Sequence, residues 1–338
     1  MTARFTLAMI DNPFLAAEFA TIAARAAAAG FKPVSYASNE AFQRADHTDT
    51  DVVLCMGSTG CDSALMDRMP RLRALLSAVT GVEGFDVAAA TARGVMVGNG
   101  QTELNYTGMA ESTVLLILAA LYDFNHTQAL LRENRQRPSP LRARPLKGRT
   151  IGFIGFGKIA QETAARLAAW DVRMICAAHR PNPHMDALNV DQVELETLLA
   201  RADVVSLHCS LNPQTHHLLN ASRLALMKPD AILVNTARGG LVDEEALIEA
   251  LCAGRIGGAA LDTFAVEPLP PDSRLRDLHN VILTPHMIGH TNEGNVTLME
   301  NAWQSIRNLA QGEPPVFLKN PEITERWRAR FAAAITTP

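Results

Sequence analysis

The chain has 338 residues, of which 48% are hydrophobic and 20% are charged, and its formal net charge is −4 at pH 7. This composition is typical of a soluble globular protein of about two domains. A weakly acidic chain lacks the basic field that attracts nucleic acid or an anionic membrane surface, so we expect neither among its partners.

Short apolar runs alternate with helical periodicity in the N-terminal part of the chain. We predict strands at 5–10, 51–56 and 73–79 and an amphipathic helix at 14–29. This alternation is typical of a small parallel sheet. Because the run at 5–10 stops at Asp11, we interpret it as the first strand rather than as a signal peptide.

A glycine-containing loop, Thr80 to Asp86, follows the strand at 73–79. Such a loop can present backbone N–H groups to a small anion, although a plain turn explains the same residues. Beyond it, one continuous helical pattern runs from 105 to 133 and is predicted to lead from a first domain into a second.

The next stretch, from Thr150 to Ala160, combines a short apolar strand, two glycines and the start of a helix. Gly155 permits a tight turn, and Gly157 lets a pyrophosphate approach the backbone at the helix N-terminus. Ala160 stands where the third glycine of a dinucleotide fingerprint is needed only for close packing. The strand–turn–helix context therefore predicts dinucleotide binding.

From this point strands and helices alternate regularly. Strands are predicted at 150–154, 172–177, 203–208, 230–235, 257–261 and 280–283. This pattern predicts an α/β fold with a doubly wound parallel sheet. We expect a dinucleotide-binding domain at 105–289 and a substrate-binding domain made of 1–104 with 290–338, to which the last helix, about 290–311, returns.

Polar residues follow three of these strands. Arg238 lies beyond the strand at 230–235, and Glu267 and His286 lie beyond the next two strands. Ligands of doubly wound sheets bind at the carboxyl ends of the strands. Histidine can exchange a proton beside a hydride path, a carboxylate can orient it and favour the imidazolium, and arginine can hold a substrate carboxylate and polarise its carbonyl. Jointly, these residues predict catalysis, although each alone is more often structural.

The chain resembles the D-isomer-specific 2-hydroxyacid dehydrogenases. The resemblance rests on the segments described above together with Leu207-His208, Asn235 to Gly239 and Thr284-Pro285-His286. The resemblance implies a Rossmann domain plus a smaller flavodoxin-like α/β substrate-binding domain, and a homodimer with contacts along the helix at 105–133. It implies that Arg238, Glu267 and His286 are catalytic, with His286 as the acid in reduction. It also implies that the backbone of Gly81 and Val82, together with Arg238, binds the substrate.

The cofactor expected is NADP(H), with NAD(H) possible. An acidic residue usually stands about 20 residues beyond the glycines of an NAD site, where it binds the ribose hydroxyls. Here that place holds Ala178, followed by His179 and Arg180, so nothing repels a 2′-phosphate and a guanidinium can pair with it. The candidate cofactor-binding residues are Gly155, Gly157, Lys158, Ile159, His179, Arg180, Thr236, Ala237 and Asp262.

The function expected is hydride transfer between this cofactor and a small D-2-hydroxyacid or 2-oxoacid, with glyoxylate or hydroxypyruvate reduction preferred. One alternative is a dehydrogenase of a larger or phosphorylated acid. Another is a dinucleotide-sensing protein that resembles the transcriptional corepressors of this fold. The five cysteines form no CxxC pair, so we expect reduced thiols in a cytoplasmic protein, and no metal site.

Overall fold

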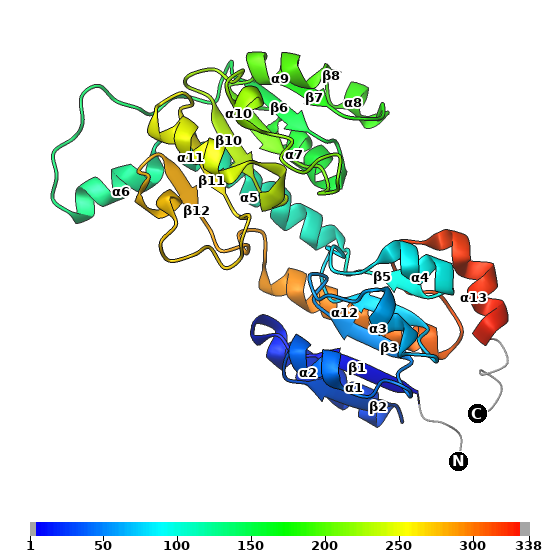
Figure 1. Ribbon diagram of the computed structural model, residues 1–338. Helices are drawn as coiled ribbons and strands as arrows, with labels where there is room; N and C mark the ends of the chain where they lie inside the picture. The colour runs from blue at the N-terminus through cyan, green and yellow to red at the C-terminus, as the bar shows by residue number, and fades with distance from the viewer. Residues whose placement is uncertain (1–4, 332–338) are drawn as a thin grey trace. The chain divides into compact units, whose positions relative to one another are not determined.

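Two open sheets organise the chain, of which the computed structural model describes residues 5–331. The chain divides into two units, Met1–Glu103 with Asn292–Pro338, and Leu104–Thr291. The first unit therefore combines the two ends of the chain, coloured blue to cyan and orange to red in Figure 1.

The sheet of the first unit has five parallel strands in the order β2-β1-β3-β4-β5, which is the flavodoxin-like order. Its strands are β1 (Thr6–Ile10), β2 (Lys32–Tyr36), β3 (Val52–Cys55), β4 (Ala74–Ser77) and β5 (Met96–Gly98). One face packs against α1 (Ala16–Ala28), α12 (Asn292–Ala310) and α13 (Thr324–Phe331). The other face packs against α2 (Asn39–Arg44), α3 (Ser63–Asp67) and α4 (Val87–Arg93).

The sheet of the second unit has seven parallel strands in the order β12-β11-β10-β9-β6-β7-β8. Its strands are β6 (Thr150–Ile154), β7 (Arg173–Ala177), β8 (Val190–Gln192), β9 (Val204–Leu207), β10 (Ile232–Asn235), β11 (Gly258–Leu261) and β12 (Val281–Leu283). Six of them lie at the positions predicted from the sequence, because strands buried on both faces form continuous apolar runs. The short edge strand β8 was not predicted.

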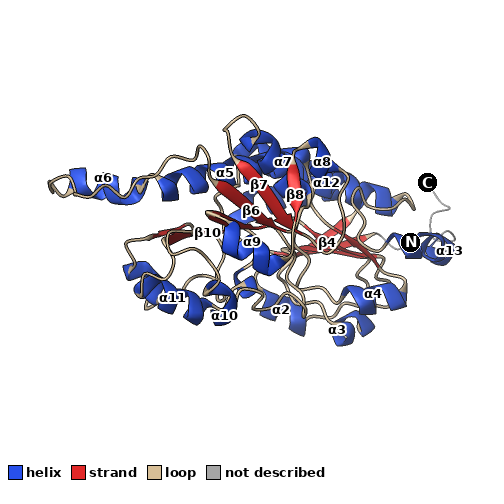
Figure 2. Cartoon of the chain, turned by 90° about the horizontal axis from the view of Figure 1, so that it is seen from above, coloured by secondary structure: helices blue, strands red, loops and turns tan. Residues whose placement is uncertain are grey.

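Helices cover both faces of this second sheet (Figure 2). One face packs against α5 (Glu103–Leu121), α7 (Lys158–Leu167) and α8 (His184–Ala187). The opposite face packs against α9 (Leu195–Arg201), α10 (Ala221–Leu224) and α11 (Glu244–Cys252). The fold is therefore a doubly wound, Rossmann-type α/β sheet, whose strand order reverses between β6 and β9.

The prediction of one continuous helix at 105–133 is wrong. The structure has two helices, α5 and α6 (Phe124–Arg132), separated at Tyr122 and Asp123. Asp123 adopts the left-handed conformation, with φ of 50°, which interrupts the helical hydrogen bonds. Aspartate tolerates this conformation better than most residues, and no glycine or proline marks the break in the sequence.

Helix α5 also has the length and mean hydropathy of a membrane-spanning helix. Its residues Leu116, Ile117 and Leu121 are buried in one hydrophobic core with Ile151 and Phe153 of β6. A core helix of an α/β domain passes the same test of length and composition, and this packing identifies α5 as one.

Candidate active site

The glycine loop after β6 leaves room for a phosphate group at the N-terminus of α7. Gly155 has φ of 89°, a conformation that glycine adopts without strain. Gly157 is the N-cap residue of α7, and a Cβ atom added there would meet no other atom within 4 Å. Lys158 and Ile159 open the helix, whose first N–H groups receive no side-chain cap. These residues fit the pyrophosphate of a dinucleotide.

The loop after β7 is fixed to this glycine loop. Asn182 Nδ2 and Gln161 Nε2 both donate to the carbonyl oxygen of Phe156, at 2.9 and 3.0 Å. Between Ala177, the last residue of β7, and Asn182 lie the exposed residues His179 and Arg180. Among the described residues, Arg180 forms no ion pair. Its guanidinium therefore remains available to an anion near the glycine loop.

Asn235 shapes the loop that carries Arg238. The buried Asn235 side chain accepts the Ala237 N–H at 3.0 Å and donates to the Arg238 carbonyl oxygen at 2.9 Å. Next to it, a Cβ atom added at Gly239 would lie 1.9 Å from the carbonyl carbon of Phe264. Only glycine allows this approach, which places the loop of Arg238 against the loop that leads to Glu267.

Glu267 and His286 are in direct contact. His286 Nδ1 lies 2.7 Å from Glu267 Oε2, and the other carboxylate oxygen accepts the Phe264 N–H at 3.0 Å. Burial alone would raise the pKa of Glu267, but hydrogen bonds from His286 and Phe264, with the nearby charges of His286 and Arg238, lower it below its usual value. The carboxylate is thus ionised and orients the imidazole ring.

Asp262 holds the turn on which His286 stands. Its Oδ1 atom accepts the Thr284 hydroxyl at 2.7 Å and the N–H groups of Met287 and Ile288 at 3.0 and 3.2 Å. His286 has φ of 53°, a left-handed conformation that is costly outside glycine and that these bonds support. Burial raises the pKa of Asp262, against the effect of its hydrogen bonds.

Gly81 and Val82 belong to the first unit, whereas the other residues singled out in the sequence belong to the second. Within the described chain, the N–H groups of Gly81 and Val82 donate to no protein acceptor. Two successive free N–H groups suit a small anion.

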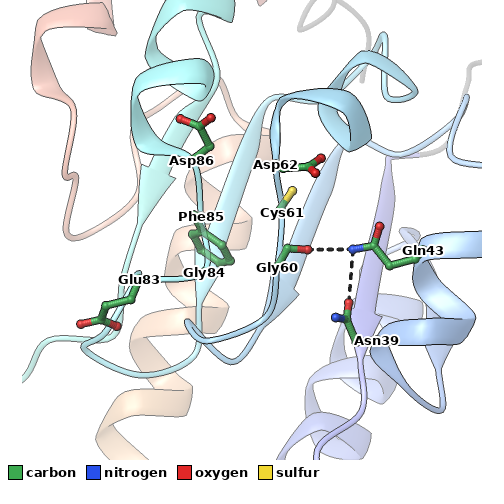
Figure 3. Close-up of a pocket in the computed structure, with 9 residues that line it drawn as sticks. All are labelled: Asn39, Gln43, Gly60, Cys61, Asp62, Glu83, Gly84, Phe85 and Asp86. Carbon is green, nitrogen blue, oxygen red and sulfur yellow. Dashed lines mark hydrogen bonds between the residues drawn. The ribbon is translucent and has the colours of Figure 1, made fainter. Parts of the chain in front are cut away.

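A cavity of about 520 Å³ lies in the first unit between α2 and the loops after β3 and β4 (Figure 3). Gln43 reaches from α2 to the carbonyl oxygen of Gly60, and Asp62 and Asp86 cap the first turns of α3 and α4. None of the candidate site residues lines it.

Several contacts at the site were missed from the sequence. The Thr236 hydroxyl lies 3.3 Å from that of Thr113, which is fully buried in α5, and Thr284 bonds Asp262. The proximity of Thr284 to His286 in the sequence was the only available signal. Met287, which follows His286, has an exposed side chain.

The family model described as D-isomer specific 2-hydroxyacid dehydrogenase, NAD binding domain, matches residues 114–288. A glyoxylate reductase of Thermofilum pendens is 37% identical over 281 residues, covering 81% of this chain and 83% of the relative. The chain belongs to the D-isomer-specific 2-hydroxyacid dehydrogenases. It is therefore an oxidoreductase with a pyridine-nucleotide cofactor.

Relatives within this dehydrogenase family carry different substrate names. A D-3-phosphoglycerate dehydrogenase of Mycobacterium bovis is also 37% identical, over 266 residues, but the chain spans only 50% of that relative's length. The solved structure of an NADPH-dependent glyoxylate/hydroxypyruvate reductase from Sinorhizobium meliloti matches with a TM-score of 0.80 and 27% identity. The match covers 93% of this chain and 97% of that structure.

Proposed function

We propose that this dehydrogenase reduces a small 2-oxoacid, either glyoxylate to glycolate or hydroxypyruvate to the D-2-hydroxyacid, with NADPH as the preferred reductant. The contact between Glu267 and His286 carries the proposal, because it joins a proton donor to an ionised carboxylate at the carboxyl edge of a dinucleotide-binding sheet. The names of the glyoxylate-reducing relatives support the choice of substrate.

Three residues of the chain would have separate roles in the reduction. Arg238 would pair with the substrate carboxylate and polarise the carbonyl group. His286, with Nδ1 held by Glu267, would donate the Nε2 proton to the carbonyl oxygen. Glu267 would stabilise the imidazolium before that transfer. When bound, the cofactor would supply the hydride to the carbonyl carbon, so that the carbonyl group becomes an alcohol.

The preference for NADPH rests on the loop after β7. Gly155 N–H donates to the carbonyl oxygen of Ala177 at 2.9 Å, so Ala178 and Arg180 follow a strand end that lies beside the glycine loop. Asn182 fixes the far end of this loop on Phe156. No carboxylate stands where the ribose hydroxyls of NAD are usually bound, and Arg180 can pair with a 2′-phosphate.

A phosphorylated substrate is the second candidate, since the phosphoglycerate relative matches with equal identity. The sequence neighbours of the catalytic pair favour the small acid. Val266 and Met287, which adjoin Glu267 and His286, are exposed apolar side chains without a charge for a phosphate group.

The test is to follow NADPH and NADH consumption in parallel with glyoxylate, hydroxypyruvate, pyruvate and 3-phosphohydroxypyruvate. We expect turnover of the short acids with NADPH, and its loss in His286→Ala. Faster turnover of the phosphorylated acid would select the second candidate. Binding of cofactor without turnover of any acid would refute the proposal.

We also propose a homodimer formed along α5 and α6. Leu115, Tyr122, Phe124 and Leu131 expose apolar side chains along these helices, and the exposed fraction of Leu131 is 84%. Helix α6 and the loop after it extend away from the second sheet in Figure 1. Light scattering should give twice the mass of the chain, and Leu115→Arg with Phe124→Arg should give the monomer.

A cytoplasmic location completes the proposal. All five cysteines lie in the described chain as free thiols. Burial raises the pKa of Cys176 to about 12, which keeps this thiol protonated and unreactive. Cell fractionation with detection of the enzyme tests the location.

A further inference from the structure

Asn99, at the end of β5, anchors the loop that contains Gly81 and Val82. The residue is buried, with 6% of its surface exposed, and its Nδ2 donates to the carbonyl oxygen of Thr80 at 2.6 Å. The neighbouring Gly100 strengthens the link, since its N–H donates to Val79 and its carbonyl oxygen accepts the Thr80 hydroxyl. The segment after β5 therefore holds the start of the loop.

This bond also determines the direction of an N–H group. The Thr80 carbonyl and the Gly81 N–H belong to one peptide unit, which is trans. In a trans peptide the C=O and N–H bonds point in opposite directions. Because Asn99 holds the Thr80 oxygen, the Gly81 N–H points away from Asn99, and it donates to no protein acceptor among the described residues.

The next peptide unit is held in a similar way. A Cβ atom added at Gly57 would lie 1.7 Å from the carbonyl oxygen of Gly81, so this oxygen packs directly against the Gly57 backbone. The Val82 N–H, which shares that peptide, is consequently turned away from Gly57. Two successive carbonyl groups are fixed on the protein, and the two matching N–H groups remain for a ligand.

We propose that Asn99 is a positioning residue for the substrate carboxylate, which it serves by holding the Gly81 N–H ready for the anion. The inference rests on the proposed function. Asn99 touches no reacting atom in this role. It acts through the peptide unit that it orients.

The Oδ1 atom of Asn99 makes it possible to test the positioning role separately from a purely structural role. This atom is buried and has no hydrogen-bond partner among the described residues. A buried acceptor without a donor destabilises the folded state. Replacing Asn99 with leucine removes this acceptor together with the bond to Thr80, which is a partly exposed residue that water can reach, so we expect little change in Tm and a clear loss of anion binding.

The experiment compares Asn99→Leu with the matched control Asn301→Leu. Asn301 Nδ2 also donates to a backbone carbonyl oxygen, at 2.9 Å, but this oxygen belongs to Gln101 in the segment after β5 rather than to the loop at 80–82. Calorimetry measures the Kd of NADPH and then the Kd of oxamate, an unreactive 2-oxoacid analogue, for the NADPH complex. We expect Asn99→Leu to weaken oxamate binding by about tenfold, with NADPH binding unchanged, and the control to change neither.

A second readout follows the Gly81 N–H directly. In protein labelled with ¹⁵N-glycine, the Gly81 signal, assigned with Gly81→Ala, should shift on oxamate addition in the wild type and respond weakly in Asn99→Leu. An equal response and equal oxamate affinity in both would overturn the role of Asn99. Turnover of 2-oxoacids by a wild type whose Gly81 signal ignores oxamate would overturn this inference alone. Absence of both turnover and oxamate binding would refute the inference together with the proposed function.

Discussion

Glu267 uses both of its carboxylate oxygens to fix His286 on its loop. Oε2 lies 2.7 Å from His286 Nδ1, and Oε1 accepts the Phe264 N–H at 3.0 Å, so the carboxylate cannot turn away from the ring. The ring nitrogen that does not touch Glu267, Nε2, is the one left for the substrate.

We predict that Glu267→Gln lowers kcat/KM for reduction by about 100-fold, because a neutral amide stabilises the imidazolium less than a carboxylate does. Because hydrogen bonds hold the pKa of Glu267 below its usual value, the wild-type carboxylate stays ionised in mild acid, so the loss in Glu267→Gln should persist across the pH range of the assay. Measuring kcat/KM between pH 5 and 9 checks the loss and its pH profile. Glu244→Gln is the control, since Glu244 also accepts a backbone N–H of this loop, that of Ala265. An unchanged kcat/KM in Glu267→Gln would contradict the assignment.

Asp262 supports the left-handed turn of His286 through hydrogen bonds rather than through charge alone. Asparagine can still accept the bonds from Thr284, Met287 and Ile288, whereas leucine leaves these donors buried without a partner. We therefore expect Asp262→Asn to lose about tenfold in kcat, and Asp262→Leu to lose more than 100-fold with a stability loss of about 2–4 kcal/mol. Steady-state kinetics measures the loss of kcat, and urea unfolding measures the loss of stability. An equal loss of kcat in the asparagine and leucine variants would show that the charge of Asp262 matters and the turn does not.

The cofactor preference should depend on Ala178 and Arg180, in the loop after β7. Arg180→Ala should raise the KM for NADPH by roughly tenfold to a hundredfold and leave that for NADH nearly unchanged, because only NADPH carries the 2′-phosphate. Adding Ala178→Asp should reverse the preference, since its carboxylate repels that phosphate and can bind the ribose hydroxyls. Arg173→Ala, at the opposite end of β7, serves as the control. If the double variant still prefers NADPH, the residues that determine the cofactor preference lie elsewhere.

The two sheets could be predicted from the sequence wherever strands are buried on both faces. Strands such as β6 and β9 are buried at every residue and are mostly apolar. The strands that escaped prediction, β2, β5 and β8, lie at sheet edges. β2 and β8 are partly exposed and lack a continuous apolar run, and β5, although buried, has only three residues, which is too short for the local pattern to distinguish it from a loop.

From the sequence, only those site residues could be predicted that directly follow the ends of strands. Arg238, Glu267 and His286 follow β10, β11 and β12, and parallel strands end at a common edge. The bonds that fix these residues come from backbone groups, such as Phe264 N–H on Glu267. The anchoring of Thr80 by Asn99 is of the same kind. Such contacts depend on loop conformation, which no side-chain pattern records.

The buried His47 and the partly buried His208 should make the fold sensitive to mild acid. Burial lowers the pKa of His208, whose ring bonds the Ser206 hydroxyl, to about 4, and it also lowers the pKa of His47. An unfolded histidine has a pKa of about 6.5, so between these values the unfolded chain binds more protons and stability falls as pH decreases. For His208 the loss is at most about 3 kcal/mol, complete near pH 4.

Urea unfolding of the wild type and His208→Gln at pH 7.5 and 5 measures this effect. Glutamine can keep the bond to Ser206 without titrating. The difference in the free energy of unfolding between wild type and His208→Gln should therefore shrink or reverse at pH 5. Other groups titrate equally in both proteins and cancel. A constant difference at the two pH values would show that His208 does not carry the acid sensitivity.

Removing the buried Asp51 should destabilise the first unit strongly. Its buried carboxylate accepts the Thr6 N–H and Arg71, each at 2.8 Å, and pairs with Arg73 at 3.3 Å. The Arg73 guanidinium is itself buried, about 5 Å from the ring of Phe331. Asp51→Ala leaves this cation without its partner and should cost about 3–5 kcal/mol.

The expected outcome for Asp51 is a loss of folding stability without a loss of chemistry. Asp51→Asn retains an acceptor for the Thr6 N–H and should cost less than the alanine variant. Because the residue lies at the amino-terminal edge of the first sheet, kcat measured at low temperature on folded Asp51→Asn should match the wild type. Urea unfolding followed by circular dichroism gives the stability difference. A cost below about 1 kcal/mol for Asp51→Ala would mean that solvent reaches Arg73 and replaces the lost carboxylate.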